Sequence, residues 1–228
     1  GIESVEGSLT EMVSLGEANL LGIPLRGINP AGFVGQHPAL REGRRYLVAY
    51  VGVMGKQEGI DLLLDAVRVI THEHGREDIL FVLIGSGPER PHMEEYAKRI
   101  GVAPHVRFTG RIPDEDLLRY LSTADVCVNP DRVNEMNDKS TMNKIMEYMA
   151  VGKPIVQFDM TEGRFSAQEA SLYAKANDPR DFAEKILELL ADPERRRRMG
   201  EFGRRRMETE LDWRFSREAL LRAYASIP

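Results

Sequence analysis

A lysine and a glutamate three residues apart give the middle of the chain its clearest chemical signal. Lys144 and Glu147 lie in KIMEYMAVGKPIV, whose apolar spacing predicts a helix over 141–151 followed directly by a buried strand. Ser140 is the predicted N-cap of this helix. Open N–H groups at a helix N-terminus attract anions, and Lys144 adds a positive charge one turn further on. A carboxylate at Glu147 can accept hydrogen bonds from two vicinal hydroxyls, such as those of a ribose.

A plainer interpretation of this stretch stays open. Taken alone, Glu147 is a solvated helix residue, and its neighbours are what favour a role in binding. The long polar loop over 130–140 leads into the helix, so the N–H groups of Ser140, Thr141 and Met142 are expected to form the anion site.

Glycines follow the first predicted strand in GVMGKQEG (52–59). Gly52 and Gly55 let a ligand approach the backbone, and Lys56 is placed to meet a phosphate. A plain strand-to-helix turn is the alternative. The pattern is neither the three-glycine dinucleotide fingerprint nor a P-loop, which ends in Gly-Lys-Ser or Gly-Lys-Thr.

A further loop, TGRIP (109–113), carries an arginine. Arg111 suits stacking on a nucleobase or pairing with a phosphate, and a tight turn with an exposed arginine is the alternative. These loops hold no Asp-x-Asp pair and no set of histidines with ligand spacing. We therefore predict no metal and no cofactor.

Short apolar runs alternate with amphipathic stretches through most of the chain. Strands are predicted at Tyr46–Val53, Ile79–Ile84, His105–Thr109, Asp125–Asn129, Pro154–Phe158 and Ser171–Ala174. Near-continuous apolar strands that alternate with helices predict a parallel sheet covered on both faces. The expected fold is α/β: a doubly wound, Rossmann-like parallel sheet of about six strands with C-terminal helices. Ligands of such folds bind at the carboxyl ends of the strands, which is where the loops above lie.

Three segments are predicted along the chain. Residues 1–42, with scattered Gly and Pro, are interpreted as a leader or an interdomain remnant. Residues 43–210 are predicted to form the Rossmann-like domain, and 211–228 a C-terminal helix that packs on or beside it. After the last strand, helices are expected over 178–191, 193–210 and 213–224.

Composition narrows the class of protein. Of 228 residues, 42% are hydrophobic and 29% charged, as in soluble globular domains, and no window approaches the ~20 apolar residues of a membrane span. A net charge of −5 argues against a general nucleic-acid-binding protein. The single cysteine, Cys127, is predicted to be a buried thiol, which fits a cytoplasmic location. Residues 194–206 hold seven arginines, interpreted as a solvated helix face or as a patch for anionic lipid or substrate.

Five motifs in a fixed order resemble the C-terminal domain of retaining glycosyltransferase family 4, one half of the GT-B architecture. They are YVGVMGKQEGIDLLLDAV, FVLIGSGPE, VRFTGRIPDEDLLRYLSTADVCVNP, KIMEYMAVGKPIV and the helical tail, and together they span about 46–224. The resemblance implies that Glu147 holds the ribose hydroxyls. It also implies that the N–H groups from Ser140 to Asn143 cradle the diphosphate, and that Arg111 and Ile112 lie beside the base.

The chain departs from the family pattern at this same site. Lys139 stands where the family usually has a second glutamate, eight residues before Glu147. Val53 and Glu58 replace an arginine and a lysine of the first loop. Lys144 resembles the lysine of a variant found in subfamilies that transfer amino- or deoxy-sugars. We expect the diphosphate clamp to be rearranged, include Lys139 among the donor-binding residues, and assign no catalytic residue.

The resemblance implies a donor-binding domain for a nucleoside-diphosphate sugar, with UDP expected and GDP next. The implied reaction is retaining transfer of a hexosyl group to a glycan or lipid-linked acceptor. The chain holds one Rossmann-like domain, so an N-terminal acceptor domain or a partner chain is expected, and the isolated chain is expected to be inactive. The arginine-rich segment is a predicted site of peripheral contact with the inner membrane face. A non-catalytic nucleotide-sugar binding module and half of a nucleotide-sugar epimerase are the alternatives.

Overall fold

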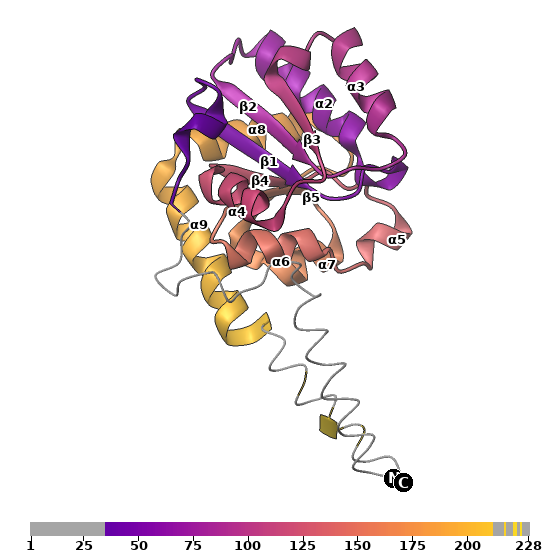
Figure 1. The fold of residues 1–228 in the computed structure, drawn as a ribbon. Helices are drawn as coiled ribbons and strands as arrows, with labels where there is room; N and C mark the ends of the chain where they lie inside the picture. Colours follow the sequence, from indigo (N-terminus) through magenta and orange to yellow (C-terminus); the bar gives the residue numbers. More distant parts are fainter. Residues whose placement is uncertain (1–34, 212–216, 218–220, 223, 225–228) are drawn as a thin grey trace.

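A six-stranded parallel sheet forms the centre of the protein (Figure 1). The computed structural model describes residues 35–211, 217, 221–222 and 224. The strands are β1 (Tyr46–Val51), β2 (Ile79–Ile84), β3 (Val106–Gly110), β4 (Val126–Asn129), β5 (Ile155–Phe158) and β6 (Ser171–Ala174). Their order across the sheet is β3-β2-β1-β4-β5-β6, and every neighbouring pair is parallel. The predicted doubly wound, Rossmann-like sheet is confirmed.

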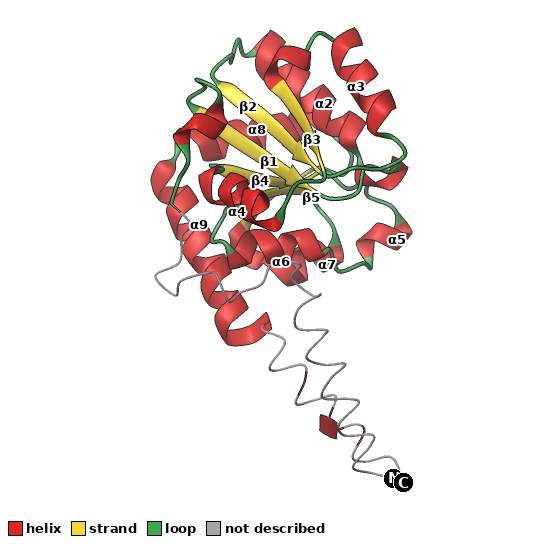
Figure 2. Ribbon diagram, in the orientation of Figure 1, coloured by secondary structure: helices red, strands yellow, loops and turns green. Residues whose placement is uncertain are grey.

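The strand order places a topological switch point between β1 and β4. From β1 the chain winds outward to β3, and it then crosses back to β4 and winds outward in the other direction. Adjacent crossovers therefore leave the sheet on opposite faces at β1 and β4, which opens a crevice at their carboxyl ends. Figure 2 shows the loops that follow the strands gathered at this edge of the sheet.

Helices cover both faces of the sheet because the strands are buried on both sides. One face packs against α2 (Ile60–Arg68), α3 (Arg90–Arg99) and α8 (Pro179–Ala191). The other packs against α4 (Asp114–Thr123), α6 (Asn143–Ala150) and α7 (Thr161–Ala167), and α9 (Pro193–Arg206) closes over α6. Every residue of β2, β4 and β5 is buried, as expected for a parallel sheet between two helical layers.

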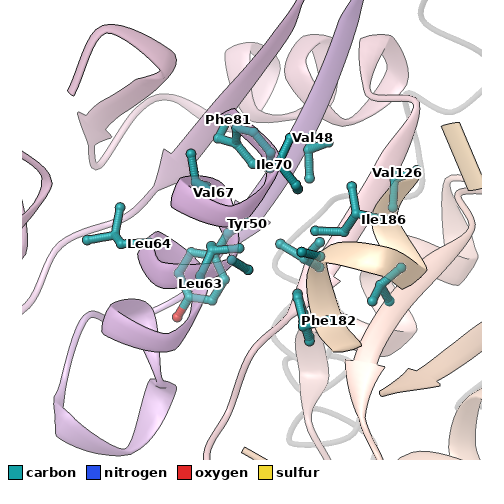
Figure 3. Packing of buried hydrophobic residues seen from close by; sticks show 14 of the residues in the cluster. Val48, Tyr50, Leu63, Leu64, Val67, Ile70, Phe81, Val126, Phe182 and Ile186 are labelled. Carbon is teal, nitrogen blue, oxygen red and sulfur yellow. The ribbon is translucent and has the colours of Figure 1, made fainter. Parts of the chain in front are cut away.

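Figure 3 shows the core on the α2–α8 side. Tyr50 and Phe81 from the sheet meet Leu63 of α2 and Ile186 of α8, and all four side chains are almost completely buried. Burying one such side chain contributes about 1.5–3 kcal/mol to the stability of the fold. The same cluster includes Val126 and Val128 of β4, so the core fixes both strands, β1 and β4, whose ends form the switch point.

The structure corrects several predicted boundaries. The first strand ends at Val51 rather than Val53, because Gly52 leaves the extended conformation with φ at +156° and starts the loop. The polar loop over 130–140 contains a short helix, α5 (Glu135–Asp138), capped by the side chain of Asn134. The helix α7 was not predicted, because its seven residues are too few to show a clear period.

The described end of the predicted leader packs on the domain. Residues 38–41 form a short 3-10 helix, and the Arg41 guanidinium pairs with Asp125 just before β4. The His37 N–H donates to Thr123 Oγ1 at 2.9 Å. The rest of that predicted segment, 1–34, and most of the predicted closing helix over 213–224 lie outside the described residues.

Most arginines of α9 have protein partners. Arg195 forms an ion pair with Glu188, and Arg197 forms ion pairs with Glu194 and Glu201. Three further arginine side chains, those of Arg196, Arg204 and Arg206, donate to backbone carbonyl oxygens. Among the described residues, the side chains of Arg198 and Arg205 have no recorded hydrogen bond or ion pair. The segment is thus largely charge-balanced, which favours the solvated-face interpretation. No helix in the described part of the chain is long and apolar enough to cross a membrane.

Candidate functional site

The switch point is held open by a tyrosine of α6. The register pairs Ala49 with Cys127, so the N–H of Val51 and the carbonyl of Val128 are the next ladder pair between β1 and β4. The Tyr148 hydroxyl lies between them. It accepts from the Val51 N–H at 2.8 Å and donates to the Val128 oxygen at 3.2 Å. The Tyr148 side chain therefore satisfies the hydrogen-bonding capacity of both backbone groups at the point where β1 and β4 separate.

The loops after β1 and β4 meet at this edge. The Arg132 N–H donates to the Gln57 oxygen at 2.9 Å, and the Asn137 amide donates to the same oxygen at 3.3 Å. Gly59, with φ at +59°, lies so close to the carbonyl of Pro130 that a β-carbon would collide with it. Glycine is required there, and the contact fixes the distance between the two loops.

Lys144 reaches from α6 into the crevice between these loops. Its Nζ lies 2.7 Å from Asp131 Oδ1 and 5.0 Å from the centre of the Tyr50 ring. The side chains of Lys144 and Asp131 are only 10% and 3% exposed. A β-carbon on Gly52 would lie 3.4 Å from Lys144 Cε, so the structure brings these two predicted site residues together.

The N-terminus of α6 supplies open N–H groups, but not those of the predicted cap. The helix begins at Asn143 with Met142 as N-cap. Ser140 instead closes α5: its N–H donates to the Asn137 oxygen and its hydroxyl to the Met136 oxygen. Among the described residues, no acceptor is recorded for the N–H groups of Thr141 through Lys144. The N–H groups without a recorded acceptor therefore begin at Thr141 rather than at the predicted Ser140, because a helical turn before α6 uses the Ser140 N–H.

Glu147 lies half-buried on α6, one turn after Lys144. No hydrogen bond or ion pair to its carboxylate is recorded among the described residues. Burial raises the pKa of Glu147 to about 7, and the nearby charge of Lys144 opposes that shift only in part. A half-buried carboxylate without protein donors is suited to accept hydrogen bonds from a ligand.

The loop between α5 and α6 is anchored to α7. Asp138 Oδ1 accepts from the Thr161 N–H at 2.7 Å, and the Thr141 hydroxyl donates to Glu162 Oε1 at 2.7 Å. Lys139 lies between these anchors and points into solvent, where it pairs with Glu135 at 3.0 Å. Its side chain is 71% exposed, so its charge is available at the surface of the loop.

Two predicted residues of the first loop have other surroundings. The Gly55 N–H donates to Glu58 Oε2 at 2.9 Å, so this backbone donor is already used within the loop. Lys56 is exposed and lines a cavity of about 400 Å³ with Asp61, Glu89 and Arg132 on the α2–α3 side. The structure therefore groups Gly52, and not Lys56, with Lys144.

The loop after β3 lies two strands from the switch point. Arg111 is exposed and has no recorded hydrogen bond among the described residues, while Ile112 is half-buried against the α4–α6 side of the core. The Gly85 N–H donates to the Gly110 oxygen at 2.9 Å, so the loops after β2 and β3 are joined. Arg111 thus extends from a braced loop on the same edge of the sheet.

Three residues of the site were missed in the sequence. Asp131 follows a buried strand inside the polar loop, Tyr50 lies within a strand, and Tyr148 follows Glu147 on the helix. Burial raises the pKa of Asp131, which marks it as a carboxylate that depends on Lys144. Two features of the sequence could have identified them: Asp131 is an acidic residue shortly after a buried strand, and Tyr148 is a tyrosine on the apolar face of a helix.

Within the described residues, no three His, Cys, Asp or Glu side chains gather as a metal-binding group. Cys127 is buried and reduced, and burial raises its pKa to about 12.

A doubly wound sheet with Lys144 and the open N–H groups of α6 at its switch point agrees with what comparison with known proteins shows. The sequence model of the family described as "Glycosyl transferases group 1" matches residues 45–192. The chain therefore belongs to the group 1 glycosyltransferases.

Two curated relatives illustrate the relationship. The chain is 29% identical over 159 residues to alpha-D-kanosaminyltransferase of Streptomyces kanamyceticus, covering 69% of this chain and 39% of that protein. It is 28% identical over 187 residues to spore coat protein SA of Bacillus subtilis, covering 78% of this chain and 48% of that protein. The chain spans less than half the length of these two relatives.

Solved structures share the fold. The Anabaena HepE protein in complex with UDP-glucose superimposes with a TM-score of 0.72 at 15% identity, over 83% of this chain and 51% of that one. The C-terminal domain of a group 1 glycosyltransferase from Francisella tularensis, LpcC, gives a TM-score of 0.61 at 17% identity, over 74% of this chain and 87% of that one. The fold is thus that of the C-terminal half of a GT-B protein.

Proposed function

We propose that the chain is the donor-binding domain of a retaining hexosyltransferase and binds a nucleoside-diphosphate sugar, with UDP as the nucleotide. The observation that carries this proposal is the arrangement on α6. Glu147, a half-buried carboxylate with no recorded donor in the described part of the chain, lies one turn from the buried ammonium of Lys144 and from open N–H groups at the helix start. A ribose diol and a diphosphate have the matching chemistry.

In this proposal the parts of the donor lie along α6 in a fixed order. The ribose hydroxyls donate to Glu147, and the diphosphate accepts from Lys144 and from the N–H groups between Thr141 and Lys144. The sugar then extends toward Lys139. Arg111 lies toward the base. UDP is favoured over GDP because solved neighbours with this fold, the HepE protein and TarM of S. aureus, were crystallised with UDP or UDP-glucose.

In the proposed reaction the bond between the anomeric carbon and the diphosphate oxygen breaks as the acceptor hydroxyl bonds to that carbon. Negative charge grows on the departing diphosphate, and the acceptor proton ends on that product. Fixed N–H donors and an ammonium stabilise such charge without a metal or a cofactor. The acceptor is a glycan or a lipid-linked sugar, held by an N-terminal domain or a partner chain.

Titration calorimetry of the 228-residue chain with UDP, GDP, ADP and free glucose tests the assignment. We expect UDP to bind more tightly than the other nucleotides, and glucose not to bind measurably. Thermal stabilisation by the same ligands gives an independent readout, since a ligand that binds the folded state raises its stability. Absence of binding by every nucleotide would refute the donor site.

A non-catalytic nucleotide-sugar binding module is the second candidate. The observation that favours it is Lys139, an exposed lysine paired with Glu135 at the position where the family usually has a glutamate. Both candidates require nucleotide binding, and only the first gives transfer when the acceptor domain is supplied. No observation specifically favours the remaining alternative, that the chain is half of a nucleotide-sugar epimerase.

A further inference from the structure

The ammonium of Lys144 is almost buried and only partly satisfied. It has three N–H donors, and the described residues provide one recorded acceptor, Asp131 Oδ1 at 2.7 Å. The Tyr50 ring lies beneath it and Gly52 beside its aliphatic chain. Two donors therefore remain for a ligand in the crevice.

Asp131 is equally dependent on this contact. Its side chain is 3% exposed, and Lys144 is its one recorded hydrogen-bond donor among the described residues. The carboxylate is placed by the backbone, because Asp131 follows Pro130 at the end of β4 and the next residue is bonded to Gln57. A rigid anion therefore holds the end of a flexible four-carbon side chain.

We propose that Asp131 is a positioning residue that holds the Lys144 ammonium at the switch point for the diphosphate of the donor. This inference rests on the proposed function. Without Asp131, Lys144 is free to leave the crevice toward solvent, where a solvated ammonium is more stable than a buried unpaired one. With Asp131, its remaining donors are fixed beside the open N–H groups of α6.

The sign of the effect separates this role from simple repulsion. A carboxylate near an anion site weakens anion binding by its charge alone, so its removal raises the affinity for UDP. A positioning carboxylate gives the opposite result while Lys144 is present. Other acidic groups near the pair, Glu58 and Glu147, remain in every variant and cannot produce this difference.

A double-mutant cycle on the full chain tests the role. UDP affinity is measured for the unaltered protein, Asp131→Asn, Lys144→Met and the double variant. We expect Asp131→Asn to weaken UDP binding about tenfold, as for one charge-assisted hydrogen bond, and to have no weakening effect when Lys144 is already Met. Asp65→Asn is the matched control, because Asp65 accepts a hydrogen bond from Tyr96 away from the crevice.

Asp131→Ser repeats the measurement with a smaller side chain in case the asparagine variant does not fold, and thermal melting verifies the fold of each variant. Unchanged or tighter UDP binding by the Asp131 variants would overturn the positioning role. An equal loss with and without Lys144 would overturn it as well, since that pattern reports a structural defect. Failure of the unaltered chain to bind UDP overturns the proposed function itself, and the positioning role with it.

Discussion

At the scale of single residues, Glu147 is half-buried and has no recorded hydrogen-bond donor among the residues that the structure describes. Burial holds the pKa of its carboxyl near 7, so the free protein carries both protonation states at neutral pH. Ribose hydroxyls that donate to the carboxylate stabilise the ionised form and lower this pKa on binding. Donor binding must then favour higher pH.

Affinity for UDP-glucose is therefore expected to fall about tenfold between pH 8 and pH 6, and to level off above pH 8, because the ionised fraction of Glu147 falls with acid. UDP-glucose is the better probe, since the terminal phosphate of UDP itself titrates with a pKa near 6. Calorimetry measures the profile. Glu147→Gln is the control, with weaker binding and no such slope; the same slope in both proteins would assign the titration to another group.

At the scale of elements, α6 is more than a scaffold for two side chains. Its Tyr148 hydroxyl replaces a ladder bond between β1 and β4 and keeps the switch point open next to Glu147. The inward face of α6 carries this tyrosine together with Ile145 and Met149, and Lys144 extends from one turn before Tyr148 to Asp131 and Tyr50. The separation of β1 and β4 at this point is thus set by the same helix that carries the proposed donor-binding residues.

Tyr148→Phe is expected to destabilise the fold by about 1–3 kcal/mol, because a buried N–H and a buried carbonyl lose their partner. Urea unfolding measures the loss. Tyr173→Phe removes a hydroxyl that also donates to a backbone oxygen, at 2.7 Å, but at an exposed position, and should cost less. An equal loss of unfolding free energy in the two variants would show that strands β1 and β4 pair directly once the Tyr148 hydroxyl is removed.

At the scale of the whole molecule, the chain contains one GT-B half. It covers 39% and 48% of the two relatives described above, and its fold matches a solved C-terminal domain. Transfer needs donor and acceptor held together in the right orientation, and that alignment supplies much of the rate. Donor binding and catalysis are therefore expected to be separable in this protein.

The 228-residue chain is expected to bind UDP-glucose without releasing UDP from it, because no domain described here holds an acceptor. Coupled detection of UDP in the presence of simple glycan acceptors measures this. A full-length group 1 glycosyltransferase serves as the positive control for the assay. Steady UDP release that Glu147→Ala abolishes would contradict the half-enzyme interpretation.

Local patterns in the sequence were sufficient for the sheet and for part of the site. Apolar runs of four to six residues located all six strands to within two residues, because strands buried on both faces leave a continuous signal. Lys144 and Glu147 were placed on the same helix, as the structure has them, because spacing on one helix is a local property. Ser140 was misassigned as a cap because its competing bonds to α5 arise in a turn that the polar loop conceals.

What the sequence determined by itself was the order of the elements, the family and the helix that carries Lys144 and Glu147. What only the tertiary structure decided was how that helix meets the sheet. The Asp131–Lys144 pair and the Tyr148 bridge to Val51, a residue 97 positions earlier, depend on the register of β1 against β4 and on the angle of α6 across them. These are long-range quantities that no local spacing encodes, since they result from packing of both faces of the sheet at once.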